Sequence, residues 1–333
     1  MRAILPEWQT GRTDRKDAMA AAMEYFLAPM AGYTDLPMRR ICRRFGLHYG
    51  TTALVDAGAL VHANPDCRAI LHRGKEEEWL QVQLLGSIPT DIRMAVRLLR
   101  EHESHFDALD FNMGCPVRKV LRRVAGAALM TQPVRALECL AVMRDEWPGR
   151  LTVKMRILKE DDPAPTVELA RKLEAAGVDG LTIHGRLARM VYSGPVHGEI
   201  IRAVREAVHI PVTANGGIFD TASAQALAQS TGCSRLMVAR GVLCNPWIFR
   251  SLNSGCDYRP ERAEVLDTMC DHVAMMVAEY GETSAMILAR KVISDYIHGR
   301  GFHHELRAMV VKLSTWQEFS EFVSVLRKAP VLT

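Results

Sequence analysis

Short apolar runs of strand length alternate with longer tracts of helical periodicity along residues 25–250. The strand-like runs are apolar almost throughout, as in parallel sheets that are covered on both faces. They span residues 25–30, 51–55, 80–85, 106–111, 151–155, 180–184, 211–215 and 235–239. The helical tracts span residues 36–45, 90–103, 135–146, 166–176, 198–208 and 221–230. This alternation predicts a parallel βα fold.

Polar residues at the ends of the strand-like runs favour a (β/α)8 TIM barrel over an open doubly wound sheet. One such residue falls at or just past each of several ends: Gln83, Cys115, Lys154, His184, Asn215 and Arg240. Strand ends in a barrel converge on one site, whereas an open sheet gathers its ligands at a single switch point. The first strand is also followed by no Gly-x-Gly-x-x-Gly motif, which counts against a dinucleotide-binding sheet.

The pattern changes near residue 255. Helical periodicity continues over 263–280, 283–297, 304–313 and 316–326, with no strand signal between these tracts. We therefore predict three parts: a mobile, polar N-terminal extension at 1–24, the barrel at 25–255, and a small helical domain at 256–333.

Composition narrows the class of protein. A hydrophobic fraction of 48% and a charged fraction of 24% are typical of a globular chain, and the net charge of +4 permits a nucleic-acid partner without requiring one. The eight cysteines show no Cys-x-x-Cys spacing, so we expect reduced thiols, a cytoplasmic location and no disulfide framework. No apolar run approaches the ~20 residues of a membrane span, and no His, Asp or Glu cluster predicts a metal site.

Cys115 is the first candidate for chemistry. It lies between Gly114 and Pro116, on a tight loop directly after a buried strand, where a side chain meets ligands more readily than a core. Four cations follow it closely: Arg118, Lys119, Arg122 and Arg123. A thiol beside a dense positive run suits a polyanionic substrate better than a buried, inert cysteine followed by a solvated helix.

Lys154 and His184 are the next candidates. A lysine inside an apolar strand is costly unless an anion or an electron-rich ring meets it. His184 ends a neighbouring strand and is followed by Gly185 and Arg186. The sequences Asn215-Gly216-Gly217 and Ala239-Arg240-Gly241 follow the last two strands, which is where barrels often bind phosphate through exposed amide groups. Together these residues predict a phosphate-bearing cofactor.

These residues resemble the tRNA-dihydrouridine synthase family. The similar segments occur in order, and the helical C-terminal part fits as well. They include residues 28–35, 112–116, 153–156, 184–186, 192–194, 215–218 and 240–247. The resemblance implies an enzyme that binds FMN and uses NADPH to reduce one uridine of tRNA to 5,6-dihydrouridine, with Cys115 protonating C5 of the uracil.

The resemblance also implies roles for individual residues. Those expected to bind the flavin are Pro29, Met30, Ala31, Gln83, Lys154, His184, Asn215, Gly216, Gly217, Ala239 and Arg240. Asn112 and Arg186 are expected to orient the uracil, and Arg118, Lys119, Arg122 and Arg123 to contact the tRNA. The helical domain would grip the tRNA by shape and backbone while the target base is flipped out. We expect a monomer that uses no metal and no membrane.

Two alternatives remain open at this point. One is a barrel flavoprotein acting on a free pyrimidine, such as a dihydroorotate dehydrogenase; the basic run and the extra helices favour RNA instead. The other is a non-catalytic tRNA-binding protein, against which the presence of Cys115, Lys154 and His184 argues. Replacement of Cys115 by alanine separates the second alternative from a synthase.

Overall fold

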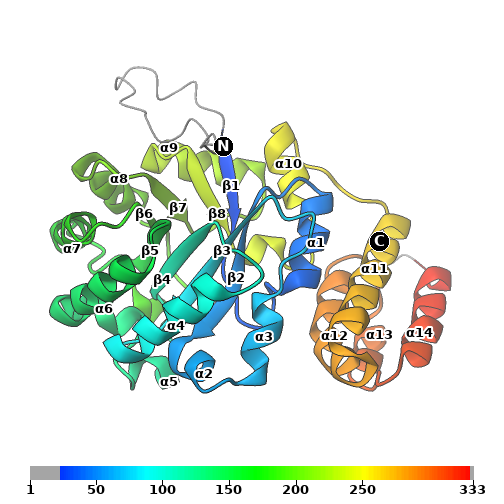
Figure 1. The fold of residues 1–333 in the computed structure, drawn as a ribbon. Coiled ribbons are helices and arrows are strands. Elements are labelled where there is room, and N and C mark those ends of the chain that lie inside the picture. The colour runs from blue at the N-terminus through cyan, green and yellow to red at the C-terminus, as the bar shows by residue number, and fades with distance from the viewer. Residues whose placement is uncertain (1–22, 331–333) are drawn as a thin grey trace, which may run out of the picture.

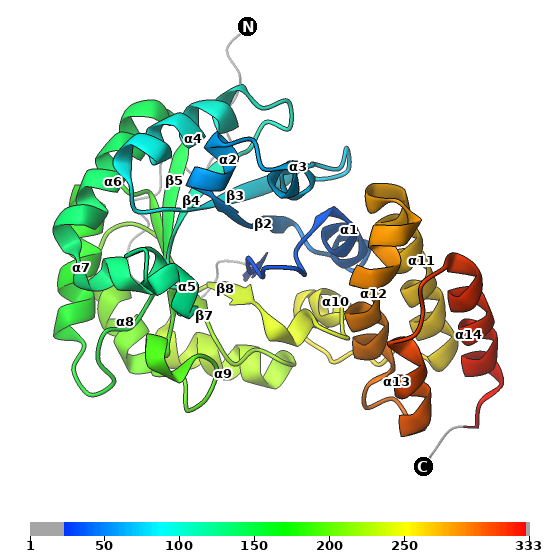
Figure 2. The ribbon, with the colours of Figure 1, turned by 90° about the horizontal axis from the view of Figure 1, so that it is seen from below.

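A computed structural model describes residues 23–330, apart from the side chains of residues 65 and 66. Parallel strands form one closed barrel in chain order, from β1 round to β8 (Figures 1 and 2). The strands are β1 (Glu24–Leu27), β2 (Tyr49–Asp56), β3 (Trp79–Leu85), β4 (Ala108–Met113), β5 (Arg150–Arg156), β6 (Gly180–His184), β7 (Val212–Asn215) and β8 (Arg235–Val238). The barrel closes where Leu27 of β1 pairs with Val238 of β8. The TIM-barrel prediction is confirmed.

Helices surround the barrel. They are α1 (Leu36–Arg44), α2 (Ala57–Val61), α3 (Pro65–Leu71), α4 (Pro89–Glu101), α5 (Arg118–Leu121), α6 (Pro133–Glu146), α7 (Ala164–Ala175), α8 (Gly198–Ala207), α9 (Thr221–Thr231) and α10 (Ile248–Ser254). Short 3-10 turns lie at η2 (Gly126–Thr131), η3 (Ala188–Met190) and η4 (Arg240–Val242). The sequence did not predict α2, α3, α5 and α10, because helices of four to seven residues show too little periodicity to detect.

Local sequence explains where several helices begin. Asp35 caps α1 by accepting a hydrogen bond from the Met38 amide, and Pro37 occupies its first turn. Asp220 and Ser223 form a capping box at the start of α9, and Gly232 ends that helix in the left-handed conformation. These capping signals determine where α1 and α9 begin and where α9 ends.

The C-terminal bundle consists of α11 (Arg262–Tyr280), α12 (Glu282–Ile297), α13 (His304–Val310) and α14 (Trp316–Lys328). It has its own hydrophobic core, separate from the barrel core, and Trp247 of the barrel side belongs to it. The helix expected at 304–313 ends at Val310, since the amides of Lys312 and Leu313 turn back to Met309 and Val310 in a tighter turn.

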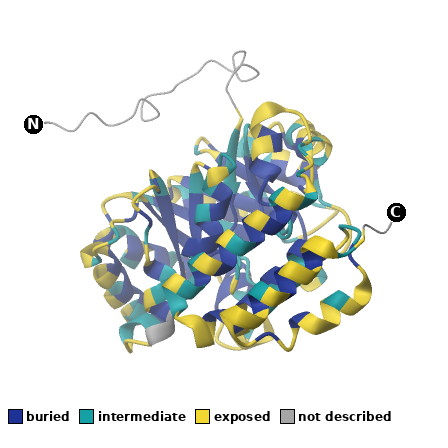
Figure 3. Cartoon of the chain, turned by 90° about the vertical axis from the view of Figure 1, so that its right-hand side faces the viewer, coloured by how far each residue is buried: buried dark blue, intermediate teal, exposed yellow. Residues whose placement is uncertain are grey.

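The bundle lies beside α1, and α11 contacts α1 directly (Figures 1 and 2). Arg44 of α1 pairs with Asp271 of α11 at 2.6 Å, and the Tyr280 hydroxyl donates to Asp35 at 2.9 Å. Buried positions face the interior of both parts, while exposed positions form the outer helix faces (Figure 3). The bundle is therefore tied to the loop that follows β1.

Most of the predicted N-terminal extension, residues 1–22, lies outside the described residues. Within the described range, no helix combines the length and apolar character needed to cross a membrane.

Candidate functional site

The barrel brings the predicted chemical residues to the carboxyl ends of its strands. Register pairs Asn112 of β4 with Lys154 of β5, and His184 of β6 with Asn215 of β7. Cys115 follows directly after β4, and Arg240 lies in η4 just after β8. Because neighbouring parallel strands end at the same edge, these side chains share one mouth, which Figure 2 faces.

Lys154 is held by a neutral partner. Its Nζ donates to Oδ1 of Asn215 at 2.9 Å, and Asn215 in turn donates to the carbonyl of Met237 at 2.8 Å. Burial, and then the nearby Arg156 guanidinium, lower the pKa of Lys154 to about 8, although Asp110 acts in the opposite direction. Within the described residues Lys154 has no ion pair. Lys154 is half-buried, so its ammonium is still open to an anionic or electron-rich ligand at the mouth.

His184 is a neutral hydrogen-bond acceptor beside Lys154. Burial, and then the cations Lys154 and Arg156, lower the pKa of His184 to about 2. Nη1 of Arg186 lies 3.3 Å from Nε2 of His184. Since a guanidinium can only donate, Nε2 must accept and the ring proton must reside on Nδ1.

Glycines allow the loop after β7 to pack closely against this histidine. Gly216 and Gly217 both have positive φ angles, of 130° and 72°. A Cβ on Gly216 would lie 3.0 Å from Cδ2 of His184, so a side chain there would press on the ring. Arg240, also predicted to bind the phosphate, has its guanidinium 4.6 Å from the centre of the Tyr192 ring.

Both the oxygen and the nitrogen of the Asn112 side-chain amide form hydrogen bonds within the protein. Its Oδ1 accepts from the amides of Gly114 at 3.1 Å and Cys115 at 3.0 Å, and its Nδ2 donates to Gln83 at 2.7 Å. Gln83 is fully buried and donates in turn to Asp110 at 2.7 Å. The structure therefore shows Asn112 fixing the Cys115 loop, a contact that the sequence did not predict.

The sequence did not lead us to predict Asp110 as a member of the site. It is 1% exposed in the barrel interior and accepts from Gln83 and from the Thr152 hydroxyl at 2.5 Å. Burial raises the pKa of Asp110 to about 6, against the lowering effect of its hydrogen bonds and of Lys154. An acidic residue inside an otherwise apolar strand was the signal that could have identified it.

The Cys115 loop is held on its other side by Arg156 and Gly126. Arg156 is 4% exposed, and its Nε donates to the Gly114 carbonyl at 2.9 Å. Its two other nitrogens donate to the carbonyls of Leu187 and Val191. A Cβ on Gly126, which has a φ of 60°, would lie 2.7 Å from the Cys115 carbonyl oxygen. The sequence had not assigned Arg156 any role.

The basic residues after Cys115 are on the surface. Arg118 and Lys119 lie in the short helix α5, and they are exposed together with Arg122 and Arg123. Arg123 pairs with Asp56, whereas the other three form no ion pair within residues 23–330. The helix α5 lies at the carboxyl-end face of the barrel (Figure 2), so these cations are available to a polyanion there.

The segment Pro29–Met30–Ala31, predicted to face the flavin, lies in the loop between β1 and α1. Met30 is half-buried and Ala31 is exposed. The Thr34 hydroxyl closes the turn by accepting a hydrogen bond from the Met30 amide at 2.9 Å. The C-terminal bundle also contacts this loop, since Lys291 donates to the Gly32 carbonyl and lies 4.3 Å from the centre of the Tyr33 ring.

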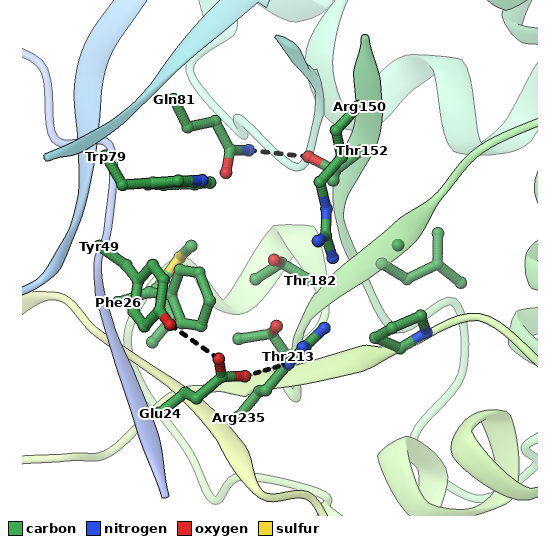
Figure 4. Close-up of a pocket in the computed structure, with 14 residues that line it drawn as sticks. Glu24, Phe26, Tyr49, Trp79, Gln81, Arg150, Thr152, Thr182, Thr213 and Arg235 are labelled. Atoms are coloured by element: carbon green, nitrogen blue, oxygen red, sulfur yellow. Dashed lines mark hydrogen bonds and ion pairs between the residues drawn. The ribbon is translucent and has the colours of Figure 1, made fainter. Parts of the chain in front are cut away.

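A separate cavity lies at the opposite, amino end of the barrel (Figure 4). Glu24 accepts from the Tyr49 hydroxyl at 2.9 Å and pairs with Arg235, and the rings of Phe26 and Tyr49 stack at 4.6 Å. None of the predicted chemical residues lines this cavity. Residues at this end of a barrel usually contribute stability, and we assign the cluster that role.

Three exposed ligand-type side chains meet at the start of α13. One ligand atom from each of His303, His304 and Glu305 lies within 4.8 Å of the others. The sequence did not predict this cluster, which lies on the bundle and outside the barrel mouth.

Comparison with known proteins places these features in a family. The model of the family described as "Dihydrouridine synthase (Dus)" matches residues 26–330. The chain belongs to the dihydrouridine synthase family. Among curated relatives, "tRNA-dihydrouridine synthase B" of Klebsiella pneumoniae is 34% identical over 275 residues, which cover 81% of this chain and 85% of the relative. A "Probable tRNA-dihydrouridine synthase" of Rhodobacter capsulatus is 33% identical over 293 residues, covering 84% and 88%.

Solved structures agree on the fold. Histamine dehydrogenase from Rhizobium sp. 4-9 is similar with a TM-score of 0.53 at 14% identity, over 76% of this chain and 49% of that chain. At that identity the likeness concerns the barrel alone. Family membership decides between the two enzyme classes that the sequence had left open, in favour of the dihydrouridine synthases.

Proposed function

We propose that this protein reduces a specific uridine of tRNA to 5,6-dihydrouridine, with FMN as its bound cofactor and NADPH as the reductant. Family membership over residues 26–330 supports the reaction class. The observation that carries the cofactor assignment is the half-buried Lys154, which hydrogen-bonds to a neutral amide and has no ion pair within the described residues. A cation left in this state fits an electron-rich ring such as isoalloxazine.

The donor set at the mouth fits FMN. Lys154, His184 and Asn215 would surround the ring together with the Pro29–Ala31 segment. Gln83, which is fully buried and hydrogen-bonded to Asn112 and Asp110, would lie behind them. Gly216, Gly217, Ala239 and Arg240 would bind the phosphate. The positive φ angles of Gly216 and Gly217 favour glycine in this loop, whose backbone would approach the phosphate. When bound, FMN would supply a hydride equivalent to C6 of the uracil, after reduction by NADPH.

The residues of the chain supply the proton and the geometry. The Cys115 thiol would donate its proton to C5 of the uracil, as a general acid. Asn112 and Arg156 hold the loop that carries this thiol, through the amides of Gly114 and Cys115 and the carbonyl of Gly114. Arg186 would orient the uracil beside them.

The tRNA would bind across the mouth. Arg118, Lys119, Arg122 and Arg123 would contact its phosphates, and we propose that residues 256–333 act as a helical domain that grips its backbone. The target base must leave the RNA stack to reach Cys115, because the thiol lies at the edge of the barrel mouth.

Two measurements test this proposal. The first is the visible spectrum of the purified protein, with identification of the released chromophore; we expect flavin bands and FMN. The second is incubation with unmodified tRNA and NADPH, followed by mass analysis of nucleosides for dihydrouridine. A colourless protein that cannot be reconstituted with FMN would contradict the redox mechanism. A flavin-containing protein that binds tRNA but forms no dihydrouridine would favour the binding-protein alternative.

A further inference from the structure

Asp110 is a buried acid that the reaction described above leaves without a role. It lies on β4 in the barrel interior, and it forms no ion pair within the described residues. Burial raises the pKa of Asp110 to about 6, although hydrogen bonds and Lys154 act in the opposite direction. Above that pH the carboxylate is ionised at a cost in stability. A group that costs stability calls for an explanation other than packing.

The hydrogen bonds between Asp110 and the Cys115 loop all run in one direction. The amides of Gly114 and Cys115 donate to Oδ1 of Asn112, at 3.1 and 3.0 Å. Nδ2 of Asn112 donates to Oε1 of Gln83 at 2.7 Å. Nε2 of Gln83 donates to Oδ2 of Asp110, also at 2.7 Å. Each group donates toward Asp110, which accepts at the end of the chain.

Both ends of this chain require that direction. Backbone amides only donate, so Asn112 must present its oxygen to the loop and its nitrogen to Gln83. Gln83 must then turn its oxygen to Asn112 and its nitrogen to Asp110, where only an acceptor fits. An ionised carboxylate only accepts, so it excludes the flipped arrangement that would turn the NH2 of Asn112 toward the loop amides. A neutral amide at position 110 would permit either direction.

The other carboxylate oxygen of Asp110 belongs to a separate branch. Oδ1 accepts from the Thr152 hydroxyl at 2.5 Å, and that hydroxyl accepts from Nε2 of Gln81 at 2.7 Å. Thr152 and Gln81 line the cavity at the amino end of the barrel, where Figure 4 shows their hydrogen bond. One oxygen of Asp110 therefore connects to the loop that carries the thiol, and the other to the cluster to which we assign stability.

We propose that Asp110 is a positioning residue for the reduction of uracil, which acts through Gln83 and Asn112 to hold the Cys115 loop where the thiol can donate its proton. This deepens the proposed function and rests on it. Hydrogen bonds to a charged acceptor are roughly twice as strong as those between neutral groups, so the carboxylate strengthens the chain at its base. It also fixes the amide orientations on which the loop depends.

The test separates two half-reactions in full-length holoprotein. Reduction of the flavin by NADPH without tRNA does not involve the thiol, whereas reoxidation of the reduced flavin by unmodified tRNA requires its proton. Asp110→Asn keeps the shape of the side chain and removes its charge. It should slow reoxidation by tRNA about five- to tenfold, because one charge-assisted hydrogen bond is weakened. Reduction by NADPH should stay near the wild-type rate.

A second measurement follows the loop without any reaction on tRNA. Cys115 is half-buried, so a loosened loop should expose its thiol more often. Alkylation of Cys115 by iodoacetamide, measured by peptide mass analysis, should be severalfold faster in Asp110→Asn. Cys139, buried in α6, is the internal reference and should react at an unchanged rate. Thermal stability at pH 8 should not fall, since the cost of the buried charge is removed as well.

A double-mutant cycle tests whether Asp110 acts through Gln83. Gln83→Met breaks the chain between Asp110 and Asn112. In that background Asp110→Asn should have no further effect on reoxidation by tRNA or on alkylation of Cys115. If Asp110→Asn fails to fold, Gln83→Met alone carries the test, with the same expected difference between the two half-reactions.

The matched control is Thr152→Val, which removes the hydrogen bond to the other oxygen of the same carboxylate. It should lower stability, because Gln81 also loses its acceptor, but the chain to Cys115 stays in place. Both half-reactions and the alkylation rate should therefore match the wild type. An equal loss of reoxidation in Thr152→Val would mean that any damage to the barrel interior has this effect.

Two further outcomes overturn the inference. One is wild-type reoxidation and alkylation in the folded Asp110→Asn and Gln83→Met variants. The other is a loss in Asp110→Asn that is the same with and without Gln83, or that affects both half-reactions equally, which would point to the charge on Lys154 instead. Failure of the proposed function looks different, because the wild-type protein would then form no dihydrouridine while alkylation still reports on the loop.

Discussion

Asn112 lies one position before the end of β4 and uses its side chain to hold the backbone of the loop that follows. The chain of hydrogen bonds from Asp110 through Gln83 and Asn112 to the Cys115 amide passes from the barrel interior to the thiol. Each link lies between 2.7 and 3.0 Å. At the residue scale, the position of Cys115 is therefore set by buried polar groups on two neighbouring strands, in addition to its own loop.

The first prediction concerns Cys115→Ala. Loss of the thiol should abolish formation of dihydrouridine, with a fall of about a hundredfold or more, as expected when a general acid is removed. FMN content and NADPH oxidation without tRNA should remain near wild type, since the role proposed for Cys115 concerns the uracil and not the flavin. Nucleoside mass analysis and flavin absorbance measure the two effects. Wild-type turnover in this variant would rule out Cys115 as the acid.

The second prediction concerns pH and Lys154. Its lowered pKa of about 8 means that the ammonium is deprotonated as pH rises through that value. The affinity of the apoprotein for FMN should therefore fall as pH rises above about 8. Apoprotein stability should change in the opposite direction, because between the folded pKa and the normal value of about 10.4 the unfolded state binds more protons.

Lys154→Met serves as the comparison for that prediction. It should bind FMN about tenfold more weakly below pH 8, because it lacks one hydrogen bond from a charged group, and should show neither pH trend. Fluorescence titration of FMN and thermal unfolding across the pH series measure both quantities. If FMN affinity falls equally steeply with pH in wild type and variant, another group controls it.

At the element scale, the short helix α5 and the loop between β1 and α1 are two of the segments at the barrel mouth. The run of basic residues predicted α5 as a contact for RNA. The position of the loop between β1 and α1 depends on the bundle, because Lys291 of α12 and Tyr280 of α11 both form hydrogen bonds with it. Sequence periodicity cannot show such a contact between residues 245 or more positions apart.

The third prediction is that Arg118→Glu with Arg122→Glu weakens tRNA binding and lowers its salt slope by about two, one for each phosphate that an arginine would otherwise neutralise. Arg171→Glu on α7, the same type of substitution away from the mouth, is the control and should change neither value. Binding of a tRNA transcript over a salt series provides the measurement. An unaltered slope in the double variant would mean that α5 is an ordinary solvated helix.

The fourth prediction is that Lys291→Met weakens FMN binding severalfold although the residue lies outside the barrel. Removal of its hydrogen bond to the Gly32 carbonyl should loosen the segment that presents Met30 and Ala31. Lys312→Met, on an exposed turn of the same bundle, is the control. FMN affinity equal to the wild-type value in Lys291→Met would show that the loop is rigid without the bundle.

At the scale of the whole molecule, Trp247 joins the two parts. It is fully buried, its Nε1 donates to Glu264 at 2.7 Å, and its ring contacts Phe45 of the barrel side and Tyr296 of the bundle. The Trp247 side chain therefore packs against both the barrel side and the bundle. A cavity lined by Arg262 and Arg300 lies where the two parts meet, with Arg300 5.3 Å from the Trp247 ring centre.

The fifth prediction is that Trp247→Ala lowers the free energy of unfolding by about 3–5 kcal/mol, the usual cost of a large cavity in a core. Trp147→Ala, a buried tryptophan in the barrel alone, should have a similar cost. Only Trp247→Ala should also make the bundle susceptible to proteolysis while the barrel persists. Limited proteolysis with mass analysis distinguishes the two; equal patterns would mean that the parts unfold together.

The sequence by itself determined the order of strands and helices, the barrel and the residues at the strand ends, because alternation of apolar and polar positions is a local property. It also predicted Cys115, Lys154 and His184 as candidates, since each is an unusual residue for its place in the pattern. Only the tertiary structure decided which partners these residues have: Asn112 for Cys115, Asn215 for Lys154 and Arg186 for His184. The cavity between barrel and bundle, lined by Cys244, Arg262 and Arg300, also exists only in the folded chain, because these residues come from segments whose proximity depends on packing of the bundle against the barrel.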